Sequence, residues 1–248
     1  MKKYCLWLAV CVMFWNSLFG EIKNGYGLEI DGVRASLKSL TAALKEDDGM
    51  SVFQKAQIKG KITRLLEYVT YYELTEELLV HFRTIAPDLY NEIDSIKNIA
   101  GQPVDVFVKF AAEHEMALGA YGTTNLAHDE NDNNVYTSEY GPGTVSVKIA
   151  SVNKSLSLLA HEFGHVKYQV PNLASYYKFY STTYLNNAFN SRYIGHNSND
   201  PSGQKAIEYE NMFRSDYLLF VRATSITLEN PQALLVSIRK SVVKNGPF

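Results

Sequence analysis

The stretch SLLAHEFGHV, residues 157–166, decides how the rest of this chain is interpreted. It places His161 and His165 four positions apart, and Glu162 directly follows the first histidine. On an α-helix, side chains four positions apart lie one above the other, so both imidazoles can reach the same ion. Zinc binds histidine nitrogen at about 2.0–2.1 Å. The spacing therefore predicts that His161 and His165 are ligands of Zn²⁺.

The sequence around the two histidines predicts an amphipathic helix over residues 154–170, which ends before Pro171. Its apolar stripe consists of Leu156, Leu159, Ala160 and Phe163. Glu162 lies about 100° around the helix from His161, so it can border the same cleft without binding the ion. From there it can take a proton from a zinc-bound water. Gly164, in the middle of the helix, predicts that another part of the backbone passes close by.

Two histidines do not complete a catalytic zinc site, so a third ligand must come from elsewhere in the chain. The metzincin continuation of the motif is excluded, because Tyr168 and Pro171 stand where that class has glycine and histidine. A glutamate on a later helix is the other common solution. Glu208 and Glu210 lie on such a helix, which we expect over residues 201–223.

The choice among the candidate third ligands depends on burial. Glu210 has mainly apolar neighbours at helical spacing, whereas those of Glu208 are mostly polar. A carboxylate on a buried face needs a partner such as a metal ion, so Glu210 is the predicted third ligand. An ion pair with Arg214, four residues later, is the competing explanation for a buried Glu210. Glu208 and the loop residue His196 stay open as alternative ligands.

Composition and charge narrow the class of protein. The 248 residues are 46% hydrophobic and 20% charged, which is the profile of a globular chain. A net charge of −2 without a long basic run argues against nucleic-acid binding. Lys2 and Lys3 before the apolar run 4–19 predict a signal peptide over residues 1–20, and hence a periplasmic or extracellular protein. We expect membrane contact only if this segment is retained as an anchor. Both cysteines lie in it, so the exported part would have no disulfide.

Hydrophobic periodicity predicts an α+β fold, mainly helical, with a small mixed or antiparallel sheet beside the histidine helix. We expect one domain over residues 21–248, with a helical part at 35–100 and a catalytic part at 103–224. The further helices are expected at 35–45, 51–85, 87–100 and 231–243, and the strands at 103–110, 116–121, 135–140 and 144–150. A loop or short strand is expected at 21–33, and an acidic solvated turn at 127–134. The strand at 144–150 should line the cleft and offer its edge to an extended substrate.

The histidine motif, followed about forty residues later by a helical glutamate, resembles the zincin metallopeptidases and among them the gluzincin-like group. The stretch DPSGQKAIEYENMFR, residues 200–214, is similar to the matching region of bacterial effector-type zinc peptidases, including Rhs-toxin-associated families. The shared pattern comprises Ala206, Glu210, Asn211 and Arg214. The resemblance covers residues 144–217 and implies a zincin-like fold, bound Zn²⁺ and peptidase activity.

The sequence therefore predicts an exported zinc-dependent metallopeptidase that acts on a peptide or protein, with Glu162 as general base. The alternative is a non-catalytic zincin-like protein that binds metal at the cell envelope, although binding alone would not need Glu162. A helical envelope scaffold with a chance motif is the third possibility. Two histidines and a glutamate beside an apolar stripe would be costly without partners, which favours a metal site over chance.

Overall fold

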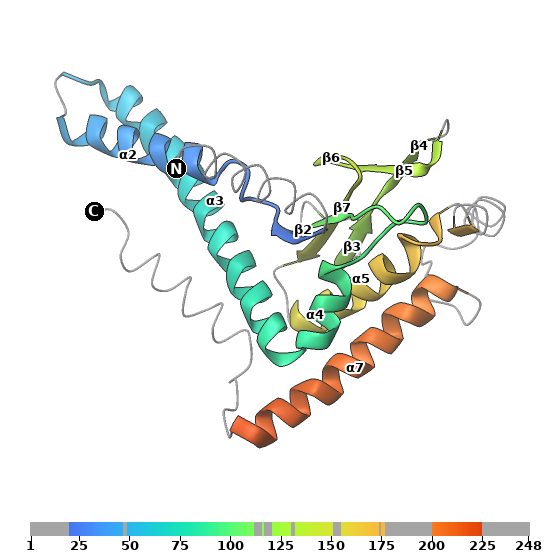
Figure 1. The fold of residues 1–248 in the computed structure, drawn as a ribbon. Helices are drawn as coiled ribbons and strands as arrows, with labels where there is room; N and C mark the ends of the chain where they lie inside the picture. Colours follow the sequence, from blue (N-terminus) through green and yellow to red (C-terminus); the bar gives the residue numbers. More distant parts are fainter. Residues whose placement is uncertain are drawn as a thin grey trace, which may run out of the picture.

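The computed structural model of this chain describes residues 20–46, 49–111, 116, 121–129, 132–150, 155–173, 175–176 and 200–224. Over residues 127–129 and 132–136 it describes the backbone and not the side chains. The predictions for the signal peptide, for His196 and for a helix at 231–243 fall outside the described residues and stay predictions. The described part is α+β, as the sequence predicts, with helices packed on a small mixed sheet (Figure 1). None of its helices is both long and apolar enough to cross a membrane.

The structure describes five helices, two of which begin at a side-chain cap. They are α2 (Ile30–Glu46), α3 (Val52–Ile85), α4 (Pro87–Asp94), α5 (Ser155–Gln169) and α7 (Pro201–Thr224). At the start of α3, the Ser51 hydroxyl accepts from the Gln54 amide at 3.3 Å, and the Gln54 side chain accepts from the Ser51 amide at 2.9 Å. At the start of α7, the Asp200 carboxylate accepts from the Ser202 amide at 3.0 Å. The positions of α5 and α7 confirm the two helices on which the predicted site depends.

The main sheet has four strands in the order β1-β2-β7-β3. β1 (Ile22–Asn24), β2 (Asp105–Ala111) and β7 (Thr144–Ala150) run parallel, and β3 (Gly122–Asn125) runs antiparallel to β7. The expectation that residues 144–150 offer a free edge is therefore wrong, because β7 is paired on both sides. Within the described residues, β3 is the edge strand on this side of the sheet.

The segment expected to be a solvated turn and the segment expected to be a loop or short strand both contain regular structure. The acidic segment 127–134 contributes to a smaller sheet made of β4 (Ala127–Asp129), β5 (Asp132–Ser138) and β6 (Gly141–Pro142). Its polar composition misled the prediction because strands pair through backbone groups that every residue type carries. The segment 21–33 does include the short strand β1, but α2 already begins at Ile30, whose side chain is buried.

The main sheet has one apolar and one polar face, because side chains alternate along its strands. The apolar face carries Val106, Val108 and Phe110 of β2 together with Val145, Val147 and Ile149 of β7. In Figure 1, α4, α5 and α7 lie below the sheet, whereas β4, β5 and β6 lie above it. Phe82 of α3 joins two of the other helices: its ring stacks on Phe213 of α7 at 5.1 Å and meets Phe163 of α5 edge-on at 5.2 Å.

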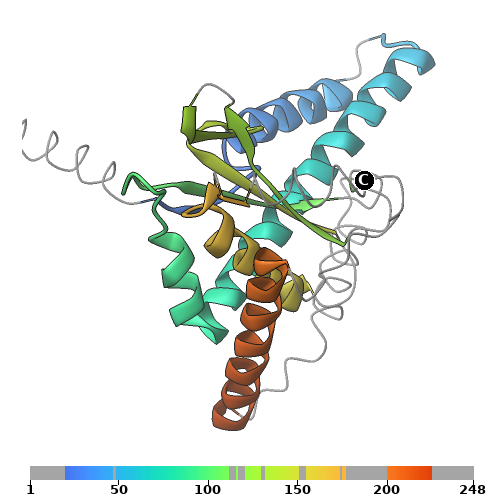
Figure 2. The ribbon, with the colours of Figure 1, turned by 90° about the vertical axis from the view of Figure 1, so that its right-hand side faces the viewer.

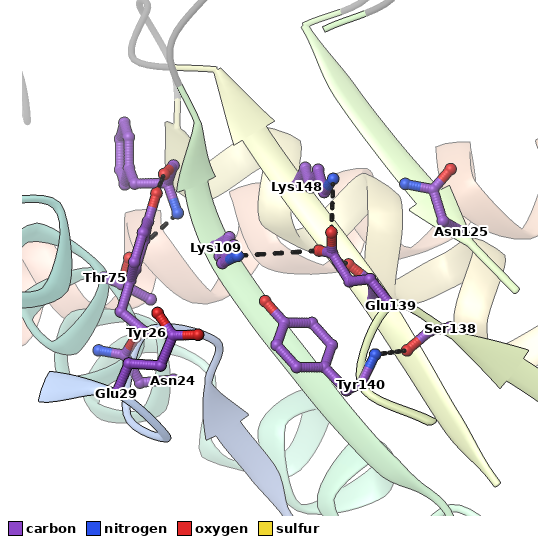
Figure 3. A network of polar contacts seen from close by, with 12 residues as sticks. Asn24, Tyr26, Glu29, Thr75, Lys109, Asn125, Ser138, Glu139, Tyr140 and Lys148 are labelled. Carbon is purple, nitrogen blue, oxygen red and sulfur yellow. Dashed lines mark hydrogen bonds and ion pairs between the residues drawn. The ribbon is translucent and has the colours of Figure 1, made fainter. Parts of the chain in front are cut away.

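A polar network covers the opposite face of the main sheet (Figure 3). Glu139, in the turn between β5 and β6, lies 3.1 Å from the ammonium of Lys148 on β7 and 4.0 Å from that of Lys109 on β2. The Lys109 ammonium also faces the rings of Tyr26 and Tyr140, at 5.0 and 5.3 Å from their centroids. These contacts hold the turn between β5 and β6 against the polar face of the main sheet. The helices α4, α5 and α7 lie on the side of the apolar face.

α2 and the N-terminal half of α3 form an arm that projects from the rest of the molecule in both views (Figures 1 and 2). Val52 and Phe53, in the first turn of α3, are 85% and 71% exposed. Within α2 only Ile30 is buried. The arm therefore adds little to the core, and the C-terminal half of α3 makes most of its buried contacts.

β1 is shorter than β2 and pairs with it only as far as Val108. Beyond that point, two side chains form hydrogen bonds with the backbone of β2 in place of a neighbouring strand. The Thr75 hydroxyl of α3 accepts a hydrogen bond from the Phe110 amide at 3.0 Å, and the Tyr26 hydroxyl donates to the Phe110 carbonyl. Thr75 is fully buried and donates its own proton to the Tyr71 carbonyl at 2.8 Å. A single hydroxyl thus satisfies a buried backbone amide and links α3 to the sheet.

Replacing Thr75 by valine should lower the free energy of unfolding by about 1–3 kcal/mol, because the buried Phe110 amide loses its acceptor. Thr84→Val is the matched control, since Thr84 makes the same bond to the carbonyl four residues before it but is exposed. It should change stability by less than about 0.5 kcal/mol. Urea unfolding followed by circular dichroism measures both variants, and equal effects would contradict the role of Thr75.

Candidate metal centre

α5 packs against the sheet on one side and α7 on the other, and its buried face fixes where the two histidines stand. The residues of this face are Leu159, Ala160, Phe163 and Val166. His161 and His165 lie at its rim and are partly exposed. Their ring centroids are 5.1 Å apart with the ring planes at 77°, so both rings border the same space beside the helix.

His161, Glu162 and His165 together form a group of candidate metal ligands. One ligand atom from each lies within 4.8 Å of the others, and the described residues contain no second group of this kind. Imidazole nitrogen and carboxylate oxygen are donors that Zn²⁺ accepts, so the residues fit the ion that the sequence predicts. Glu162 is only 5% exposed, and a carboxylate this buried needs hydrogen bonds or a cation.

Strand β3 holds the carboxylate of Glu162 at the edge of the main sheet. Thr124 donates a hydrogen bond from Oγ1 to Oε2 of Glu162 at 2.7 Å. Gly122 leaves room for the carboxylate, since a Cβ there would lie 2.5 Å from Oε1 of Glu162. The sequence does not single out Gly122 or Thr124, because their contact with Glu162 joins residues about forty positions apart. The one local signal is strand alternation, which places both residues on the same face of β3.

A buried serine of α7 contacts the second histidine. Oγ of Ser202 lies 2.8 Å from Nδ1 of His165 and accepts a hydrogen bond from the Gln169 side-chain amide at 3.0 Å. Ser202 is fully buried and Gln169 almost so. Sequence reasoning missed Ser202, although it lies four and eight positions before Ala206 and Glu210, and therefore along one side of α7.

Of the two candidate glutamates of α7, Glu210 lies beside the histidines and Glu208 lies on the exposed side of the helix. Oε2 of Glu210 lies 3.4 Å from Nδ1 of His161, while Arg214 holds the other oxygen at 2.5 Å. The Glu210 carboxylate is not part of the group within 4.8 Å, so joining both histidines on one ion requires a change of its rotamer. Glu208 is 53% exposed, and both of its oxygens lie 2.9 Å from the ammonium of Lys205. His196 lies outside the described residues.

α5 and α7 touch at Gly164, which confirms the close approach predicted from this mid-helix glycine. A Cβ on Gly164 would lie 2.5 Å from Cα of Ala206 and 2.6 Å from the carbonyl oxygen of Lys205. Ser202 and Glu210 stand four residues before and after Ala206 on the same helix. The backbone contact therefore sets the distance at which both side chains meet the histidines of α5.

Glu92 of α4 provides a second link between α5 and α7. It pairs with Lys167 of α5 and accepts a hydrogen bond from the Tyr209 hydroxyl of α7 at 2.5 Å. Burial on its own raises the pKa of Glu92, but the hydrogen bonds from Lys167 and Tyr209 and the charges of Lys167 and Lys205 outweigh it, so the pKa is lowered. A lowered carboxylate pKa stabilises the fold at neutral pH, and this stabilisation is lost as the pH falls through that pKa.

Comparisons with known proteins add no family to these observations, since no family model, no curated protein and no solved structure matches the chain. The assignment of the site therefore depends on the chemistry and the geometry of the described residues. The group formed by His161, Glu162 and His165 and the contacts that β3 and α7 make with it carry that assignment.

Substituting Gly164 by alanine should cost about 1–3 kcal/mol of stability, because the new methyl group meets the α7 backbone rather than a flexible side chain. Gly60→Ala is the matched control, since Gly60 lies inside α3 with no heavy atom within 4 Å of an added Cβ. This change should stabilise the protein by about 0.5–1 kcal/mol through helix propensity. Chemical denaturation gives the free energy of unfolding of both variants. A Gly164→Ala variant that is more stable than the wild type would refute the close contact.

Proposed function

We propose that this chain is a zinc-dependent metallopeptidase with a zincin-like catalytic domain. The observation that carries the proposal is the group of His161, Glu162 and His165 beside the edge strand β3. A site that only stored metal would have no need of a buried glutamate next to the first histidine. The signal peptide that the sequence predicts over residues 1–20 would export the enzyme, which would then act in the periplasm or outside the cell.

His161 and His165 would hold the ion, and Glu162 would act as general base. When bound, Zn²⁺ supplies an acidified water and polarises the carbonyl of the substrate. Glu162 then accepts the proton of the attacking water and delivers it to the departing amine. Thr124 supports this role, because its hydrogen bond to Oε2 orients the carboxylate without neutralising it. The buried position of Glu162 keeps competing water away from the proton transfer.

The edge strand supports a peptide as the substrate rather than a small molecule. Within the described residues β3 pairs only with β7, and in this proposal its other edge would pair with an extended chain. Gly122 and Thr124 of this strand lie against the carboxylate of Glu162. A peptide added to β3 would therefore run past the general base, which is the arrangement that peptide-bond hydrolysis needs.

Glu210 is the proposed third ligand. One oxygen of its carboxylate lies near His161, while the other forms the ion pair with Arg214 that the competing explanation predicts. A bound ion would compete with Arg214 for the carboxylate, and a rotamer change would bring the oxygen to both histidines. Glu208 is a poor candidate, since Lys205 holds it at the exposed side of the helix.

Glu162→Gln should retain one zinc ion per chain and lower kcat by about 100- to 10,000-fold, because it removes the proton acceptor alone. Hydrolysis of a mixed library of fluorescence-quenched peptides and zinc content by mass spectrometry measure the two effects. His161→Ala is the control that should lose both zinc and activity. Peptide hydrolysis that is equal in wild type and Glu162→Gln would exclude the proposed mechanism. Zinc binding without hydrolysis in either protein would favour the metal-binding envelope protein.

Glu210→Gln should weaken zinc binding by at least about 10- to 100-fold, whereas Glu208→Gln should leave it unchanged. The two variants form a matched pair, because both remove one negative charge from the same helix. Competition with a chromophoric chelator gives both dissociation constants. Equal zinc affinity in the two variants would remove Glu210 from the ligand set and return the choice to His196.

A further inference from the structure

We propose that Ser202 is a positioning residue for His165, which keeps the imidazole proton on Nδ1 so that Nε2 is the nitrogen that binds the metal. The inference builds on the proposed function and adds a residue that the motif does not contain. Ser202 touches neither the ion nor the substrate in this proposal. It acts through the tautomer and the orientation of His165.

The position of the Ser202 hydroxyl is fixed by burial and by hydrogen bonds. Its Oγ lies 2.8 Å from Nδ1 of His165, and the residue is fully buried in the first turn of α7. The backbone around it is fixed as well, since its amide donates to the capping carboxylate of Asp200 at 3.0 Å. The contact at Gly164 and Ala206 then sets the spacing between α5 and α7. Solvent does not compete for this hydroxyl, so the hydrogen bond keeps its strength.

The contact between Ser202 and His165 matters because it can determine which ring nitrogen of the imidazole carries the proton. A neutral histidine carries a proton on one ring nitrogen and a lone pair on the other, and only the nitrogen with the lone pair can bind a metal. The hydroxyl oxygen of Ser202 has two lone pairs. It can therefore accept from Nδ1 of His165 and from the Gln169 amide, at 3.0 Å, at the same time. The hydroxyl can also donate to an unprotonated Nδ1, so the contact itself fits both tautomers; the proposal selects the one with the proton on Nδ1, because only that tautomer leaves the lone pair of Nε2 to the metal.

A purely structural role would not require serine at this position. Alanine has a higher helix propensity than serine, and α7 uses alanine at the next contact with α5, at Ala206. Gln169 lies on α5 four residues after His165, and its amide is directed to the same hydroxyl. The hydroxyl thus contacts the side chains of two residues of one helix, His165 and Gln169, and such a contact behind a ligand histidine orients its ring.

The first test reads the tautomer in the metal-free protein. Long-range ¹H–¹⁵N spectra of ¹⁵N-histidine-labelled full-length chain, at about pH 8 where histidines are neutral, report which ring nitrogen carries the proton. His165 should be mainly protonated on Nδ1 in the wild type, and this preference should be lost in Ser202→Ala. Ser215→Ala is the control, since Ser215 lies on the same helix but bonds only the Asn211 carbonyl at 3.1 Å. The same tautomer in Ser202→Ala and wild type would overturn the proposal.

The second test measures zinc binding by competition with a chelator. Ser202→Ala should lower the affinity by about 10- to 100-fold, the usual effect of removing a partner behind a ligand histidine. Ser215→Ala should not change it. An unchanged affinity in Ser202→Ala, with zinc bound normally by the wild type, would overturn the proposal. A wild type that shows the tautomer preference but binds no zinc would refute the proposed function and leave the positioning of His165 by Ser202 standing.

Discussion

The close contact between the backbones of α5 and α7 is the constraint on which the site depends. At Gly164 there is no room for a side chain, because an added Cβ would fall 2.5 Å from Cα of Ala206. Helices that approach this closely leave only short side chains between them, so the polar groups of one helix reach those of the other directly. Ser202 and Glu210 meet His165 and His161 for this reason. A larger residue at the contact would separate both pairs at once.

Around this contact, four segments of the chain each determine a different property of the site. α5 supplies the histidines and the glutamate and sets their mutual spacing. β3 holds the carboxylate of Glu162 at the edge of the sheet. α7 fills the space behind the histidines, and α4 steadies α5 and α7 through Glu92. The three helices α4, α5 and α7 contribute to one hydrophobic core, in which Phe82 of α3 contacts Phe163 of α5 and Phe213 of α7.

Sequence reasoning succeeded where the decisive interactions are local. The helix around His161 follows from the apolar stripe, and the start of α7 follows from Asp200 and Pro201. The glycine at position 164 predicted a close contact because a helix interior otherwise disfavours glycine. Which element makes that contact was not predictable from the spacing. The partners of Glu162 and His165 were missed for the same reason, as they lie 38 and 37 positions away in the chain.

Because α7 follows α5 in the chain, the site can be completed only after α7 has been synthesised. Ser202 leaves the ribosome 37 residues after His165, which corresponds to about 2–7 s at ordinary rates of synthesis. Until α7 docks, neither Ser202 nor Glu210 can make its contact with the two histidines. An ion that arrived during synthesis would meet flexible, competing ligands. In the proposed function, an ion that binds after α7 has docked would meet oriented ligands.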